Sequence, residues 1–155
     1  MGRKILGVVV GYLVSAVWVF ATLSLAWVAL GRGFAWEEGS TRTSIGWTLL
    51  MLVSGFVGAV LAGWVAAAIG RSRQAATWLA VVILVLALAL AVFNLTLDRE
   101  AKVAEVLAGR APAELPMMEA ASVSIPPAWY DWVIGLVGAA GAVAGGRLWG
   151  RRAGG

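Results

Sequence analysis

Cysteine and histidine are both absent from this 155-residue sequence. Without cysteine the chain cannot form a disulfide, supply a thiolate nucleophile or ligate an iron–sulfur cluster. Without histidine it also lacks the commonest metal ligand, the usual haem ligand and the side chain that most often serves as a general base near neutral pH. We therefore expect no catalytic residue, no metal and no cofactor in this protein.

Charged residues are scarce, at 13% of the chain, whereas hydrophobic residues make up 61%. Soluble domains carry about 25% charged residues, so the composition excludes an ordinary soluble domain and indicates an integral membrane protein. The formal net charge is +4, but the basic residues gather in short clusters at the ends of apolar runs, where they set membrane topology. We expect the lipid bilayer, and not nucleic acid, to be a partner of this chain.

Four apolar runs are long enough to cross a bilayer, which takes about 20 residues of helix. They cover about 5–30, 47–69, 75–97 and 127–149. Because the runs are continuous and do not alternate every second residue, the sequence predicts an all-α integral membrane fold and not a β-barrel. We expect a single four-helix transmembrane domain over 1–155, arranged as two helical hairpins.

The first apolar run follows a basic amino end, as a secretory signal peptide does, and Ser24 and Ala26 have the spacing of a cleavage site. The run is longer than the roughly 7–15 apolar residues of a signal peptide. We therefore expect it to remain uncleaved as the first span.

Small residues recur at four-residue spacing in three of the four runs, which places them on one face of each helix. In lipid such bare faces let helix backbones approach closely, because burying large apolar side chains gains nothing against equally apolar lipid. In the second run they form two adjacent stripes, so this run is expected to organise the packing of the chain. The predicted helix-interface residues are Gly7, Gly11, Ser15, Gly55, Gly58, Ala59, Ala62, Gly63, Ala66, Gly135, Gly138, Ala142 and Gly146.

The third run differs in kind, because the stretch 81–90 holds no glycine and is almost uniformly bulky. It is therefore predicted to be the most lipid-exposed helix. Its one strongly polar residue, Asn94, lies near the outer end and is expected to bond a neighbouring helix or interfacial water.

The segment 98–126 is predicted to be the only sizeable extramembrane loop. Asp98 suits a helix N-cap and Gly109 a C-terminal stop, and apolar residues between them fall on one face, so a short amphipathic helix is predicted there. All four prolines of the chain follow it and predict an ordered but irregular return. The last of them, Pro127, is expected to begin the final helix.

Similar short motifs lie within the second and fourth runs: Gly55-Phe-Val-Gly58-Ala and Gly135-Leu-Val-Gly138-Ala. Each run then continues with small residues and ends in a basic cluster. Internal duplication of a helical hairpin and coincidence in a glycine- and alanine-rich sequence both account for this likeness.

Charge placement predicts the orientation in the membrane. The amino end, the turn at 71–73 and the carboxyl end carry basic residues and no acids, whereas every acidic residue lies on the opposite side. Positively charged segments stay in the cytoplasm, so both termini are expected there. The alanine-, glycine- and arginine-rich composition favours a bacterial cytoplasmic (inner) membrane.

No charged residue lies near the middle of an apolar run, which disfavours ion-coupled transport and voltage sensing. The leading hypothesis is a non-enzymatic scaffold or accessory subunit that packs against itself, as a homo-oligomer, or against larger membrane partners through its small-residue helix faces. Two alternatives remain open: a small channel or transporter for neutral or lipid-like solutes, and an enzyme acting on lipid at the outer surface.

Overall fold

A computed structural model of the protein describes residues 1–110 and 114–152. The predicted all-helical architecture is confirmed over these residues. Four helices are long and apolar enough to cross a membrane: α1 (Gly2–Leu30), α3 (Ile45–Gly70), α4 (Arg73–Thr96) and α7 (Tyr130–Arg152). Three more are short: α2 (Arg32–Ala35), α5 (Arg99–Leu107) and α6 (Met117–Val123).

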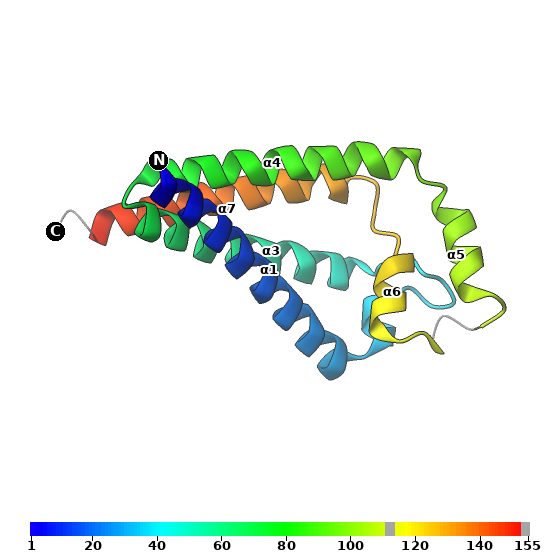
Figure 1. The fold of residues 1–155 in the computed structure, drawn as a ribbon. Coiled ribbons are helices and arrows are strands. Elements are labelled where there is room, and N and C mark those ends of the chain that lie inside the picture. The colour runs from blue at the N-terminus through cyan, green and yellow to red at the C-terminus, as the bar shows by residue number, and fades with distance from the viewer. Residues whose placement is uncertain (111–113, 153–155) are drawn as a thin grey trace.

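The four long helices form an elongated bundle in which α3 is central (Figure 1). It packs against α1 on one side and α7 on another, while α4 packs mainly against α7. The start of α1 and the end of α7 lie at one end, which we call the terminal end, and α5 and α6 lie at the other, which we call the capped end (Figure 1). The carboxyl half of α1 diverges from α4 and α7, so α1 is held mainly by α3 (Figure 1).

The turn between α3 and α4 is short because each helix has its own stop and start signal. Arg71 adopts the left-handed conformation (φ 48°) that ends α3. The Ser72 side chain then accepts a hydrogen bond from the backbone N–H of Gln74 at 3.2 Å and begins α4. The chain thus reverses within a few residues, as the sequence predicts.

The exposure of the long helices differs from the prediction that the third run is the most lipid-exposed helix. α1 buries only Gly7 and Gly11, whereas α4 buries five residues, four of them alanines. α4 as a whole is therefore not the most exposed of the long helices, although none of its five buried residues lies within 81–90. Its alanines allow α7 to pack closely, whereas α1 has a close neighbour on one side only.

The capped end is an ordered unit, which we call the cap and define as 31–44, 99–110 with α5, and 114–126 with α6. Trp36 and Thr43 pair as an isolated antiparallel bridge within 31–44. The returning chain joins them, because Thr43 N–H donates to the carbonyl of Ile125 and Ile125 N–H donates to that of Thr41, both at 3.0 Å. Two loops far apart in the sequence are thereby tied together.

The predicted amphipathic helix is present as α5. Asp98 caps it by accepting a hydrogen bond from the N–H of Ala101 at 3.0 Å, and Gly109 follows its end with a φ of 84°. The return that follows contains a second helix, α6, which the sequence reading missed. The final helix begins at Tyr130 and not at Pro127, whose carbonyl accepts from the N–H of Tyr130 in the turn before it. The proline at 112 lies outside the described residues.

Candidate functional site

The first small-residue stripe of α3 faces α1. A Cβ on Gly7 would lie 2.6 Å from the carbonyl oxygen of Ala66, and one on Gly11 would lie 2.7 Å from that of Ala62. Since real Cβ atoms do not come so close, only glycine permits this approach of the two backbones. The predicted interface residues that meet here are Gly7, Gly11, Ser15, Gly58, Ala62 and Ala66.

The second stripe of α3 faces α7, where the approach is closer still. A Cβ on Gly63 would overlap the carbonyl oxygen of Ala142, and one on Gly145 would overlap that of Val60. Gly145, like Gly141 beside it, was missed in the sequence, although the two share the four-residue spacing that revealed the others. The predicted residues at this contact are Gly55, Ala59, Gly63 and Ala142.

The remaining predicted glycines of α7 face α4. A Cβ on Gly135 would lie 2.6 Å from the Cβ of Ala87, and one on Gly138 would lie 2.9 Å from Ile83 Cγ2. A Cβ on Gly146 would overlap that of Ala76. All thirteen predicted interface residues thus lie where long helices of this one chain meet. These faces are filled within the chain, so a partner would require another surface.

Several polar side chains within the bundle link helices, and one of them also bonds its own backbone. Thr22 Oγ1 and Ser54 Oγ share a hydrogen bond between α1 and α3, and Thr22 also donates to the carbonyl of Trp18. Asn94 Nδ2 donates to Asp131 Oδ2 at 3.2 Å and so joins α4 to α7 at the capped end. This is the interhelical role predicted for Asn94.

Tryptophans form the centre of the cap. Trp27 meets Trp36 and Trp47 edge to face, with ring centroids 5.8 and 5.9 Å apart. Trp36 Nε1 donates to Ser124 Oγ at 2.9 Å, which satisfies the indole where the ring is buried. The buried core of the cap consists of Ala35, Trp36, Trp47, Leu115, Ala120 and Val123. The cap therefore has its own hydrophobic core.

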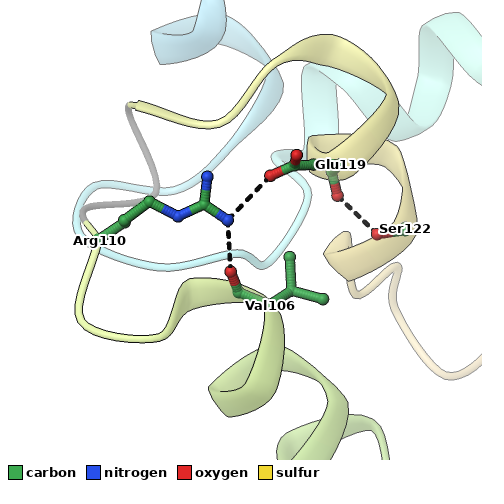
Figure 2. A network of polar contacts seen from close by, with 4 residues as sticks. All are labelled: Val106, Arg110, Glu119 and Ser122. Atoms are coloured by element: carbon green, nitrogen blue, oxygen red, sulfur yellow. Dashed lines mark hydrogen bonds and ion pairs between the residues drawn. The ribbon is translucent and has the colours of Figure 1, made fainter.

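An exposed ion pair on the surface of the cap links the segment that follows α5 to α6. Arg110 Nη2 donates to Glu119 Oε2 at 3.0 Å and to the carbonyl of Val106 at 2.9 Å (Figure 2). Ser122 Oγ donates to the carbonyl of Glu119 and closes the last turn of α6 (Figure 2). Glu119 thus has a structural partner. In the part of the chain that the structure describes, no group of three or more carboxylates could hold a metal ion.

A cavity of about 370 Å³ lies beneath the cap, where the ends of the long helices meet it. Its volume is within the range of small-molecule sites, about 300–1,000 Å³. The lining is mainly apolar, with a few polar groups converging from different elements. The lining side chains that frame it are Trp27 and Trp47, Met51, Asn94, Lys102 and Asp131. This combination suits an amphipathic molecule with a small polar group.

These features define a class: a bundle of four apolar helices, closed at one end by an ordered cap over an amphipathic cavity. Comparison of the chain with protein families, with curated proteins and with solved structures returns no match.

Proposed function

We propose that this chain is a multi-pass membrane protein without enzymatic activity, which serves as a scaffold or accessory subunit in a larger membrane complex. Four long apolar helices support insertion into a bilayer. The basic residues of the sequence gather at the terminal end, which supports a cytoplasmic location for both termini in a bacterial inner membrane. The cap then lies on the outer side.

We also propose that the bundle consists of two helical hairpins, α1 with α3 and α4 with α7. The packing of α1 on α3 and of α4 on α7 supports this division. The close contact of α3 with α7 then joins the two hairpins along their glycine-rich faces.

The observation that carries the accessory role is the incomplete packing of α1. Only two of its residues are buried, and an apolar groove of about 390 Å³ runs between α1 and α3. Val17 is 68% exposed and Trp18 is 37% exposed beside this groove. Because the small-residue faces are filled within the chain, this groove is the surface that we assign to a transmembrane helix of another subunit. Its lining is Val10, Leu13, Val14, Val17, Trp18, Ala21 and Leu61.

Single-cysteine crosslinking tests this assignment directly, since the chain has no cysteine of its own. Val17→Cys should form a crosslinked species of defined mass in native membranes, and that mass distinguishes a second copy from a different subunit. Val85→Cys is the matched control, because Val85 is 58% exposed on α4, away from the groove. Equal crosslinking at both positions, or none at position 17, would contradict a partner helix in this groove.

A second candidate function is the passage or binding of neutral, lipid-like solutes, which the cavity beneath the cap favours. Its aromatic and aliphatic lining, with Asn94 and Asp131 at one side, suits an amphipathic solute. Flux assays with reconstituted vesicles test this function across several solute classes. Flux equal to that of empty vesicles would exclude solute passage as the function and leave the accessory role.

A further inference from the structure

A second groove lies at the terminal end, between the first turns of α1 and α4. It encloses about 440 Å³, and its lining is Met1, Lys4, Ile5, Val8, Val9, Gln74, Trp78 and Val82. It is separate from the groove between α1 and α3 and from the cavity beneath the cap, because it shares no lining residue with either.

The lining changes from polar to apolar along the bundle. Both helices run from the terminal end toward the cap, so Lys4 and Gln74 lie at the mouth of the groove. Valines follow one to two turns further along each helix, at Val8 and Val82. A membrane phospholipid changes from polar to apolar in the same order, from a charged headgroup to an apolar acyl chain.

The mouth of the groove offers donors to an anion. Lys4 Nζ donates to Gln74 Oε1 at 2.6 Å, which orients the ammonium group across the groove. An ammonium group has three N–H donors, so two remain for a phosphate oxygen, and the amide nitrogen of Gln74 adds a further donor. The side chain of Lys4 thus bridges α1 and α4 at the depth of lipid headgroups.

The charge around the mouth has one sign. Arg3, Arg71, Arg73 and Arg147 lie on or beside the helix ends that meet at the terminal end, while every acidic residue of the sequence lies on the segments at the capped end. An anionic headgroup therefore meets only attraction here, whereas the choline of a zwitterionic lipid brings a cation toward cations. Basic pockets between membrane helices on the cytoplasmic side bind anionic headgroups for this reason.

The walls below the mouth leave room for a chain. Ile5 is 65% exposed and Trp78 is 55% exposed, so neither α1 nor α4 closes the groove. Trp78 stands one turn below Gln74, where an indole suits the boundary between headgroup and acyl chain. An acyl chain would cover these side chains without displacing a helix.

We propose that this groove binds one anionic membrane phospholipid, with its phosphate at Lys4 and Gln74 and one acyl chain along Val8 and Val82. The inference rests on the proposed membrane insertion and is independent of the accessory role. It assigns the lipid a structural task, because the lipid would fill the gap between α1 and α4, which have few contacts of their own.

Native mass spectrometry of the full chain, released from mild detergent, tests the proposal. With phosphatidylglycerol or phosphatidylcholine added, the parent protein should retain one phosphatidylglycerol at concentrations where phosphatidylcholine is lost. Lys4→Gln should weaken this retention by about tenfold or more, because a charge-assisted hydrogen bond is lost. Arg42→Gln, which removes an exposed cation at the capped end that lines neither groove nor the cavity beneath the cap, should leave it unchanged.

A second variant tests the path of the acyl chain. Val82→Trp fills the groove without changing the charge, so it should reduce retention although Lys4 is intact. Equal retention of the two lipids, or equal weakening by Lys4→Gln and Arg42→Gln, would contradict the proposed lipid site. Carbonate extraction of the same membranes separates the two failures: an extracted chain refutes membrane insertion, while a chain that stays but shows no selectivity refutes only the lipid site.

Discussion

Gly63 and Gly145 lie where the backbones of α3 and α7 come closest. A single added Cβ at either position would overlap a carbonyl oxygen of the opposite helix, which cannot rotate away as a side chain can. The room left by the missing side chain is therefore the structural contribution of each glycine. Neither residue needs an unusual φ, so close approach is the reason for glycine at both positions.

Gly63→Ala and Gly63→Leu should each force α3 and α7 apart and lower the free energy of unfolding. From the usual cost of overpacking we expect a loss of about 1–3 kcal/mol, with leucine worse than alanine. Thermal unfolding in mild detergent measures the effect.

Two controls accompany these variants. Gly33→Ala adds a Cβ into open space, and Leu86→Phe enlarges a side chain that is 42% exposed on α4, so both should unfold like the parent protein. If Gly63→Leu melts normally while Leu86→Phe does not, the packing faces assigned to α3 and α4 are wrong.

Asn94 should contribute modestly to stability through its bond with Asp131. Hydrogen bonds between membrane helices average about 0.6 kcal/mol, so Asn94→Leu should cost about 0.5–1 kcal/mol. Thr96→Val is the comparison, because the Thr96 hydroxyl bonds only the carbonyl of Phe93 in its own helix. Chemical unfolding of both variants should show a loss for Asn94→Leu alone, and equal losses would contradict an interhelical role.

Among the elements, the stability of the cap depends more on its buried hydrophobic core than on its surface ion pair. Leu115 is fully buried in the cap core, whereas Arg110 and Glu119 are each nearly half exposed. Exposed ion pairs contribute little, because water and salt screen them. The cap is therefore held by its core and by the pairing of 41–43 with Ile125.

Leu115→Ala should loosen the cap without unfolding the long helices. Truncating a buried leucine costs about 2–5 kcal/mol, and here the loss falls on a small separate core. Limited proteolysis should cut within 99–123 faster than in the parent protein, while circular dichroism keeps its helical signal. Glu119→Gln should be cut at the parental rate; fast cleavage of this variant instead would show that the ion pair holds the cap.

The sequence predicts α5 but not α6, and the difference has a local cause. Asp98 is the N-cap of α5 and Gly109 directly follows its C-cap, Ala108, whereas α6 follows Pro116 with no side-chain cap and has only seven residues. Such a helix shows no usable periodicity and forms because Ala120 and Val123 are buried against the cap core. Tertiary packing decides it, and packing cannot be read from a short stretch.

The same limit applies to the candidate surfaces. Four-residue spacing predicted where Gly7 or Gly63 would permit close approach, but not which helix would fill the space. The cavity beneath the cap and the groove at Lys4 bring together residues from distant segments. Their chemistry is present in the sequence, while their proximity depends on the fold.

At the scale of the whole molecule, the four long helices bring the start of α1 and the end of α7 to one end of the bundle, so one orientation test covers the entire topology (Figure 1). A reporter active only in the cytoplasm should give signal when fused after Gly155. The same reporter inserted after Gly109, in the cap, should be silent, because the cap is expected on the outer side. The reverse pattern would overturn the orientation and place the basic terminal end outside.

The two faces of α3 also impose an order on biogenesis. The partner of one face, α1, is synthesised before α3, but the partner of the other, α7, comes last. At about 5–20 residues per second, the ribosome needs several seconds to make α4, the cap and α7 after α3 has emerged. During that interval the face with Gly63 has no helix against it. A nascent chain that stalls in the cap would thus leave an exposed glycine face for quality-control proteases or insertion chaperones to recognise.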